Sequence, residues 1–359
     1  MAKAKEKKKD KRQNRETNQA VVRQSMIRRL PRRLGARGQM ALPAAPSLLE
    51  HYYELLTEAF GALGRVFNEE ETAHLRKVLG EKLEEAFRKS PYSRVIVSYE
   101  TDEPPATSLS WRMLVNVSTV ASEYEGWVKS REPPYFGVHA DAKILDCARS
   151  LGAPKDVPVL DIGAGTGRNT LPLAREGFPT DAVELAPALA SILRAEVEKE
   201  KLPVRVIEGD ALSGTLETAK QHYRLVCLAE VIASHIRTVD HVRALCEAAA
   251  EALTVGGLFV FNAFLAKEGY RPDAMARELS QVFWSNVFTK IDIENAMRGL
   301  PFEPVSDEST HDFEHEHQPA EDWPPTGWFV NWAKGLDVYD LPLGRAPVEL
   351  RWLVYRRVG

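Results

Sequence analysis

From residue 157 onward, short apolar segments alternate with longer amphipathic ones along the chain. Apolar runs of four to eight residues are typical of buried strands, and apolar positions three or four apart are typical of helices. We predict strands at 157–161, 180–184, 203–207, 223–229, 257–264 and 349–358, and an earlier partner strand near 306–313. We predict the intervening helices at about 167–176, 186–200, 212–220 and 238–253. This alternation indicates an α/β fold with a largely parallel sheet.

The preceding segment has a different pattern. One predicted helix follows Ser47, and a second begins at Asn68, where Glu71 three residues later completes a capping signature. A short strand at 94–99 and an aromatic-containing stretch at 111–127 follow. We therefore predict an accessory, mainly helical region at 46–135 and a catalytic domain at 136–359.

Charge separates the N-terminus from the rest of the chain. Residues 1–40 contain fourteen Lys or Arg and three acidic residues, a balance of +11, so the remainder carries −15 of the total −4. The first twenty residues have too little apolar surface to fold, so we predict a basic, disordered tail at 1–45. Residues 1–40 are candidates for binding RNA, ribosomes or an anionic lipid surface. The alternative is a solubilising tail without a specific partner.

Composition is that of an ordinary globular protein, with 44% hydrophobic and 27% charged residues. No apolar run is long enough for a transmembrane segment, and no secretory signal is apparent. The three cysteines lack metal or redox spacing, and Cys227 lies in an apolar run, which predicts a core position. These features predict a cytoplasmic protein with reduced cysteines.

The clearest chemical signal is the segment VLDIGAGTGRN at 159–169, which follows the first strand of the α/β pattern. Its glycines permit positive φ and let a ligand approach the backbone closely. A dinucleotide fingerprint has the spacing G-x-G-x-x-G, whereas here the glycines run G-x-G-x-G and Arg168 occupies the sixth position. Asp161 would repel a pyrophosphate but attract a cation. S-adenosylmethionine (SAM) is a cationic nucleoside without phosphate, so this motif favours SAM over a nicotinamide dinucleotide.

The segment VLDIGAGTGRNT resembles the first motif of class I SAM-dependent methyltransferases, and GRNT followed by EGF is similar to a small-molecule branch that includes tellurite-resistance methyltransferases. The resemblance covers about residues 135–265. It implies a Rossmann-like, seven-stranded methyltransferase sheet, here with an N-terminal helical extension and a C-terminal insertion. It also implies SAM as the cofactor.

The resemblance further implies the roles of three acidic residues at successive strand ends. Glu184 stands where the family binds the ribose hydroxyls, Asp210 where it contacts the adenine amino group, and Glu230 where it faces cofactor and acceptor. Ordinary strand-end capping is the alternative interpretation. The residues we predict to bind the cofactor are Asp161, Gly163, Ala164, Gly165, Gly167, Asn169, Glu184, Leu185, Asp210, Ala211 and Glu230.

Methyl transfer from a sulfonium is an in-line displacement that depends mainly on alignment, and a base helps only when the acceptor arrives protonated. His235 and Glu230 are the catalytic candidates, because both follow the fourth strand of the pattern. A histidine that hydrogen-bonds locally is the alternative for His235. The residues that we predict to line the acceptor site are Tyr124, Tyr135, His139 and Trp328.

The C-terminal stretch at 311–332 is rich in histidine and tryptophan. His311, His315 and His317 stand among acidic residues, but the proline and acid content favours a loop, and we predict no metal site. Trp323, Trp328 and Trp332 are interpreted either as walls of an acceptor pocket or as a lid or core packed against the sheet.

Two absences narrow the acceptor class. Ala229-Glu230-Val231-Ile232 replaces the Asp/Asn-Pro-Pro-aromatic tetrapeptide of amino-group nucleic-acid methyltransferases, and no Pro-Cys dipeptide supplies a thiolate nucleophile. The sequence therefore predicts a SAM-dependent methyltransferase acting on a small molecule. The alternatives are an RNA-, ribosome- or protein-directed methyltransferase recruited by the basic tail, a SAM-binding protein without catalysis, and a NAD-dependent oxidoreductase.

Overall fold

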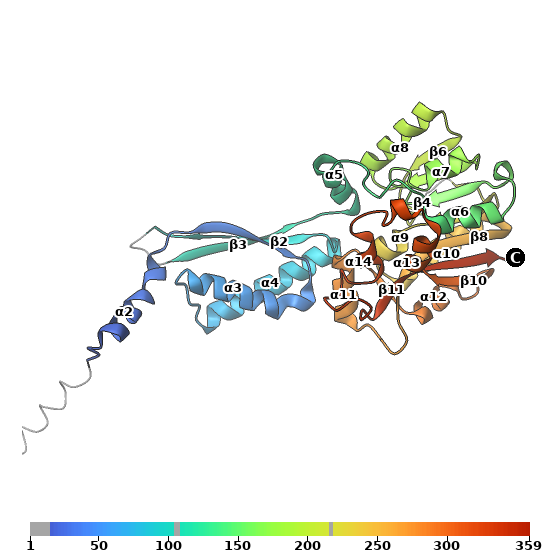
Figure 1. Ribbon diagram of the computed structural model, residues 1–359. Helices are drawn as coiled ribbons and strands as arrows, with labels where there is room; N and C mark the ends of the chain where they lie inside the picture. Colours follow the sequence, from blue (N-terminus) through green and yellow to red (C-terminus); the bar gives the residue numbers. More distant parts are fainter. Residues whose placement is uncertain (1–14, 104–107, 215–217) are drawn as a thin grey trace, which may run out of the picture. The chain divides into compact units, whose positions relative to one another are not determined.

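A computed structural model describes residues 15–103, 108–214 and 218–359 (Figure 1). The chain divides into two units, Met1–Val117 and Ser118–Gly359. The sequence placed this boundary at 135/136. The structure moves it to 117/118 because α5 (Val120–Ser130) packs against α8 (Pro187–Glu200) of the larger unit. Residues 118–135 therefore belong with the larger unit.

The smaller unit is built on an antiparallel sheet of three strands in the order β1-β2-β3, with α4 packed against the sheet and α3 packed against α4. The predicted helices and the predicted strand are present, and helices make up most of the ordered elements between residues 46 and 135; the three-stranded sheet is an addition that the sequence did not predict. Alternating side chains on paired strands, such as Leu42 opposite Val95, supply the buried face of the sheet. Its elements are β1 (Arg37–Pro43), η3 (Pro46–Leu48), α3 (Leu49–Ala62), α4 (Glu69–Lys89), β2 (Arg94–Thr101) and β3 (Leu109–Asn116).

The boundary of the basic tail also differs. Residues 37–43, which the sequence assigned to the tail, pair along their full length with β2 as strand β1. Before them stand α2 (Gln19–Ile27), capped by the Asn18 side chain, and η2 (Leu30–Arg33). Helix α2 buries none of its residues. The first fourteen residues of the predicted disordered tail lie outside the described residues.

The larger unit contains an eight-stranded sheet, in which seven strands follow the order β10-β11-β8-β7-β4-β5-β6 and the short β9 pairs with β8. Strands β4 to β8 pair in parallel, whereas β10 and β11 are antiparallel to their neighbours. This is the predicted Rossmann-like α/β sheet, with β9 as an addition. The strands are β4 (Val159–Ile162), β5 (Thr180–Glu184), β6 (Val204–Glu208), β7 (Tyr223–Leu228), β8 (Leu253–Ala266), β9 (Val287–Phe288), β10 (Phe302–Ser309) and β11 (Val348–Arg357).

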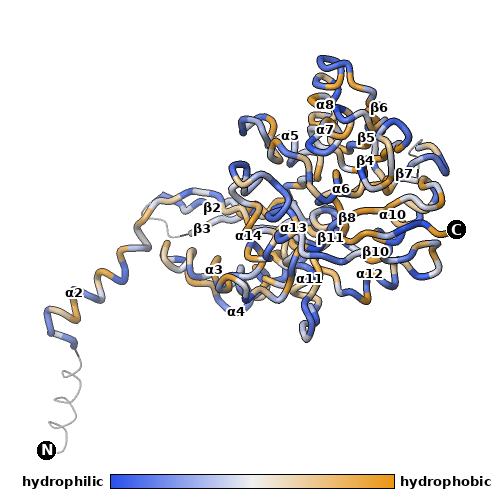
Figure 2. Tube along the Cα trace, turned by 45° about the vertical axis from the view of Figure 1, so that its right-hand side comes forward, coloured by the Kyte–Doolittle hydropathy of each residue, from blue (hydrophilic) through white to orange (hydrophobic). Residues whose placement is uncertain are grey.

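Helices cover both faces of this sheet because its strands are apolar on both sides. Leu160, Val183 and Val226 face a core that includes α10 and α12, whereas Val159 and Trp352 face a core that includes α6. Figure 2 shows the hydrophobic residues concentrated along strands such as β8. The helices are α5, α8, α6 (Ala142–Ser150), η4 (Pro154–Asp156), α7 (Thr170–Arg175), α9 (Val231–His235), α10 (Val239–Ala252), α11 (Ala274–Val282), α12 (Lys290–Met297), α13 (Thr310–His317), η5 (Ala320–Asp322) and α14 (Phe329–Ala333).

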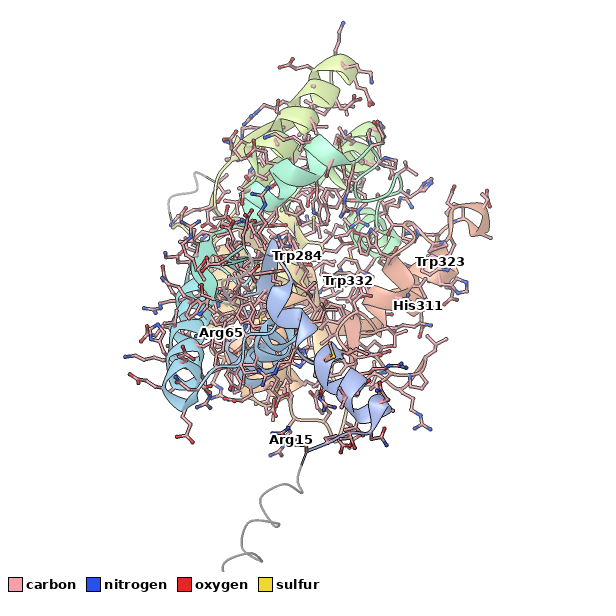
Figure 3. The ribbon with its side chains drawn as sticks, turned by 90° about the vertical axis from the view of Figure 1, so that its left-hand side faces the viewer. Arg15, Arg65, Trp284, His311, Trp323 and Trp332 are labelled. Atoms are coloured by element: carbon pink, nitrogen blue, oxygen red, sulfur yellow. The ribbon has the colours of Figure 1, made fainter. Side chains whose placement is uncertain are left out.

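Two local predictions in the larger unit are wrong. The helix expected at 212–220 is absent from the described residues of that segment, which form turns; Asp210 instead accepts a hydrogen bond from the Leu212 N–H. The histidine-rich segment expected as a loop is helix α13, which begins at the Ser309 cap. His311 on this helix packs edge-on against Trp323, with ring centroids 5.3 Å apart (Figure 3).

The cysteines also agree with the sequence prediction. Cys147, Cys227 and Cys246 are free and buried, and Cys227 lies in the core as predicted. Among the described residues, no helix combines the length and the apolar character that crossing a bilayer requires.

The capping box of α4 generates a stability prediction. The Asn68 side chain accepts the Glu71 N–H at 2.9 Å, and the Glu71 carboxylate accepts the Asn68 N–H at 3.0 Å. Asn68→Ala should lower the free energy of unfolding by about 1 kcal/mol, because an orphan helix N–H loses its partner. Chemical denaturation measures this loss. Asn68→Asp keeps an accepting oxygen and should be close to the parent; equal stability of the alanine variant would contradict the role of the cap.

Candidate functional site

A cavity of about 230 Å³ lies at the carboxyl ends of β4, β5, β6 and β7. The order of the strands reverses between β4 and β7, since β5 and β6 extend the sheet to one side and β7 and β8 to the other. Open α/β sheets bind their ligands in the crevice at such a switch point. The topology therefore places the cavity where a ligand site is expected, and all of its lining residues belong to the larger unit.

The glycine segment forms the floor of this cavity. Gly163, Gly165 and Gly167 have φ values of 78°, 57° and 97°, which only glycine adopts readily. A Cβ on Gly163 would approach the Val231 Cγ2 to 2.2 Å, and one on Gly167 would approach the Leu193 Cδ1 to 2.6 Å. Both the turn and its packing against α8 and α9 therefore require these glycines.

Two of the predicted acidic residues lie buried beside this turn. Asp161 accepts a hydrogen bond from the Thr170 hydroxyl at 2.6 Å, and Glu184 accepts the N–H groups of Gly165 and Ala186, each at 2.7 Å. Burial raises the pKa of both carboxyl groups, although these hydrogen bonds act in the opposite direction. A cation in the cavity would favour their ionised forms.

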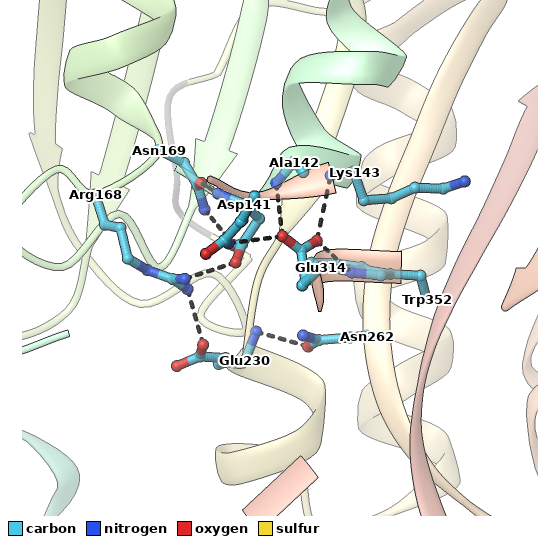
Figure 4. A network of polar contacts seen from close by, with 10 residues as sticks. Asp141, Ala142, Lys143, Arg168, Asn169, Glu230, Asn262, Glu314 and Trp352 are labelled. Carbon is cyan, nitrogen blue, oxygen red and sulfur yellow. Dashed lines mark hydrogen bonds and ion pairs between the residues drawn. The ribbon is translucent and has the colours of Figure 1, made fainter. Parts of the chain in front are cut away.

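An arginine joins Glu230, another of the predicted acidic residues, to the segment before the first motif (Figure 4). Arg168 donates to Glu230 at 2.8 Å and to Asp141 at 2.6 Å. Burial alone would lower the pKa of Arg168, but the charges of Asp141 and Glu230 raise it, so the guanidinium stays charged. Burial also raises the pKa of Glu230, against the pull of Arg168. Arg168 thus compensates the buried carboxylate of Asp141 and the partly buried one of Glu230 at the edge of the cavity.

Aromatic side chains also line the cavity. The Tyr124 hydroxyl and the His235 Nε2 are 2.9 Å apart, and both residues line the cavity together with Phe136. Trp284 packs edge-on against both Tyr124 and His235, with ring centroids 5.6 and 5.3 Å apart. Trp127 stacks on Trp284 behind them. Burial lowers the pKa of His235 to about 4, so its imidazole is neutral near pH 7.

The structure brings most of the predicted site together. All the predicted cofactor residues except Gly167 line the cavity, as do Tyr124 and His235; Gly167 lies buried within the glycine turn. The other three predicted acceptor residues are not among those lining the cavity. His139 pairs with Asp322 at 3.1 Å, Trp328 packs edge-on against Trp332, and Tyr135 precedes the residue that does reach the cavity, Phe136.

Sequence reasoning missed several residues of this site. It used Arg168 only to reject a dinucleotide motif, and it gave no role to Asp141, Phe136 or Trp284. A charged residue within an otherwise small-residue turn was a signal for Arg168. No local signal marked the other three, because they reach the site through folding.

The comparisons with known proteins agree with this geometry. Residues 159–257 match a family model described as a methyltransferase domain. A solved structure from Galdieria sulphuraria, provisionally assigned as a sarcosine dimethylglycine methyltransferase, is similar with 14% identity and a TM-score of 0.50, covering 67% of this chain and 99% of that one. A geranyl diphosphate C-methyltransferase from Streptomyces coelicolor A3(2) is similar with 16% identity and a TM-score of 0.49, covering 67% and 97%.

A curated relative matches over a shorter segment. It is provisionally assigned as ribosomal RNA small subunit methyltransferase A of Methanosphaera stadtmanae, and it is 42% identical over 55 residues. The match covers 15% of this chain, and the chain spans only 20% of the length of that relative.

The fold and the site thus define a Rossmann-like domain with a glycine turn flanked by buried carboxylates, which suits a cationic nucleoside. Residues 159–257 form a methyltransferase domain, and the fold around them is that of solved methyltransferases. The narrower similarity to tellurite-resistance methyltransferases stays a prediction.

The packing of the glycine turn gives a prediction for cofactor binding. Gly163→Ala should weaken SAM binding at least about tenfold, because the added Cβ displaces Val231 and shifts the turn that contacts the ligand. Gly177→Ala is the matched control, since Gly177 also has a positive φ of 95° but its Cβ would have only an ordinary contact at 3.7 Å. Calorimetric titration with SAM should separate the two; equal affinities would contradict the packing argument.

Proposed function

We propose that this protein transfers a methyl group from SAM to a small-molecule acceptor. The observation that carries the proposal is the mixed lining of one cavity. The glycine turn and buried carboxylates line it, and so do Tyr124, Phe136 and His235. A cationic cofactor suits the first group of residues, and a small, partly apolar acceptor suits the second.

The residues present fit SAM in their chemistry. Glu184 and Asp210 are the proposed partners of the ribose hydroxyls and the adenine amino group, and the backbone of 163–165 is the proposed contact for the rest of the ligand. Buried carboxylates with raised pKa values gain from a nearby positive charge. When bound, SAM supplies an activated methyl group, so the protein's main task is to align the acceptor.

Tyr124 and His235 are the proposed groups on the acceptor side. The neutral imidazole of His235 is able to take a proton from an acceptor hydroxyl or amine, while its contact with Tyr124 orients the ring. Trp284 and Trp127 support this pair from behind. Glu230 lines the same cavity, but its ion pair with Arg168 favours an orienting role over proton transfer.

The test of the proposal is SAM binding together with methyl transfer. Isotopically labelled SAM is incubated with the protein and a metabolite extract, and a labelled small molecule is expected. Glu184→Gln should raise the Kd for SAM at least about tenfold, because a charged hydrogen-bond acceptor is lost. Glu198→Gln, an exposed carboxylate on α8, is the control and should bind like the parent.

The other candidate functions give different results in this experiment. SAM binding without any labelled product indicates a binding protein. Absence of SAM binding would end the proposal. The chain lacking residues 1–33 tests recruitment by the basic tail, and the cut precedes Leu34 because the Leu34 and Ala36 carbonyls accept hydrogen bonds from Thr101. Full activity of this truncated chain supports a small acceptor, whereas loss indicates an acceptor held by the tail.

The lowered pKa of His235 predicts the pH profile of catalysis. Protonation of its imidazole removes the proposed base, and with a pKa of about 4 this occurs only well below pH 6. The kcat should therefore show no fall as the pH decreases from 7.5 to 5.5. His235→Asn should lower kcat about 10²-fold or more, with little change in SAM affinity. His222→Asn, an exposed histidine of the same unit, is the control; a kcat that halves near pH 6.5 would contradict the assignment.

A further inference from the structure

Helix α6 begins in an unusual way. Asp141 occupies its N-cap position, where aspartate ordinarily accepts a hydrogen bond from the first turn, but its side chain makes no such bond. The carboxylate is used elsewhere: Oδ1 accepts from Arg168 at 2.6 Å, and Oδ2 accepts from the Asn169 side-chain amide at 2.9 Å. Both partners belong to the glycine turn and line the cavity. Asp141, the residue expected to cap α6, therefore binds residues that line the cavity instead.

A residue far along the chain caps the helix instead. Glu314 of α13 accepts the Ala142 N–H at 2.7 Å and the Lys143 N–H at 3.2 Å, as Figure 4 shows. The Gln318 side chain and the Trp352 indole also donate to this carboxylate, at 2.9 and 3.0 Å. Glu314 is completely buried. Burial and the nearby Asp141 carboxylate raise the pKa of Glu314 to about 7, whereas the N–H donors to its two oxygens and the helix N-terminus favour the ionised form.

We propose that Glu314 is a positioning residue for the cofactor site: by capping α6 in place of Asp141, it leaves the Asp141 carboxylate free to hold Arg168 and Asn169. The proposal rests on the proposed function of the cavity. Through Arg168 the effect extends to Glu230, because one guanidinium bridges the two carboxylates. The C-terminal insertion thereby contributes to the site without touching it.

The physical reason for this proposal is competition for the Asp141 carboxylate, which can bind either the first N–H groups of α6 or the side chains of Arg168 and Asn169. Without Glu314, the part-buried N–H of Ala142 and the buried N–H of Lys143 lose their partner, which is costly. Asp141 is the residue adjacent to them and is of the type that caps helices best. Its rotation toward α6 would satisfy these donors and release Arg168 and Asn169. Loss of the Glu314 cap would then change the lining of the cavity as well as the stability of α6.

The experiment compares SAM affinity with stability in the full-length protein. Glu314→Gln introduces an amide N–H among four donors and should raise the Kd for SAM about tenfold. Asp141→Asn should raise it similarly, because its contact with Arg168 is weakened, and the double variant should be no worse than the weaker-binding single one. Glu314→Asp, which keeps the charge but shortens the reach, should also raise the Kd and remains available if the glutamine variant does not fold.

Two controls separate positioning from stability. Trp352→Phe removes a different donor to the same carboxylate and leaves the cap intact, so it should lower the unfolding midpoint but keep the Kd within about twofold of the parent. Glu316→Gln, exposed on the same helix, should change neither quantity.

The possible outcomes are distinct. If the Glu314 variants lose stability but bind SAM as Trp352→Phe does, Glu314 is only structural and the inference is wrong. Additive effects of Glu314→Gln and Asp141→Asn on the Kd would equally overturn it. Failure of the parent itself to bind SAM would instead overturn the proposed function.

Discussion

Buried negative charge at the carboxyl ends of the central strands is the constraint on which the larger unit depends. Asp161, Glu184 and Glu230 are all taken largely out of water around one cavity. Removing carboxylates from water is expensive unless hydrogen bonds or opposite charges replace the lost solvation. The structure supplies a threonine hydroxyl, two backbone N–H groups and one arginine. With these partners in place, a positively charged ligand would further stabilise the ionised carboxylates.

The compensation of this charge links parts of the chain that are distant in sequence. Arg168 joins the carboxylates of Asp141 and Glu230, and Glu314 replaces Asp141 at the start of α6. The hydrogen bonds from Glu314 to α6 cross more than 170 residues. The C-terminal insertion is thus part of the polar framework behind the cavity. Such networks are stable only when every member is satisfied, which makes each member sensitive to substitution.

The cavity combines this polar framework with a wall of a different kind. Tyr124 and Phe136 come from the segment before the first motif, whereas His235 and Trp284 come from after the fourth and fifth parallel strands. Their rings pack mostly edge to face, an arrangement that aromatic quadrupoles favour. Packing of this kind fixes Tyr124 and His235 in one geometry.

The sequence by itself determined the α/β class, the order of the parallel strands along the chain, the glycine turn and the acidic residues at strand ends. These features are local: strand periodicity, positive φ and the end of a strand are all encoded within a few residues. Only the tertiary structure decided that 37–43 is a strand, that 118–135 belongs to the larger unit, and that Phe136 rather than Tyr135 reaches the cavity. The roles of Asp141, Arg168 and Glu314 also depend on contacts between distant segments. Local propensity carries no information about such contacts, because the partner that satisfies a buried charge is chosen by the fold.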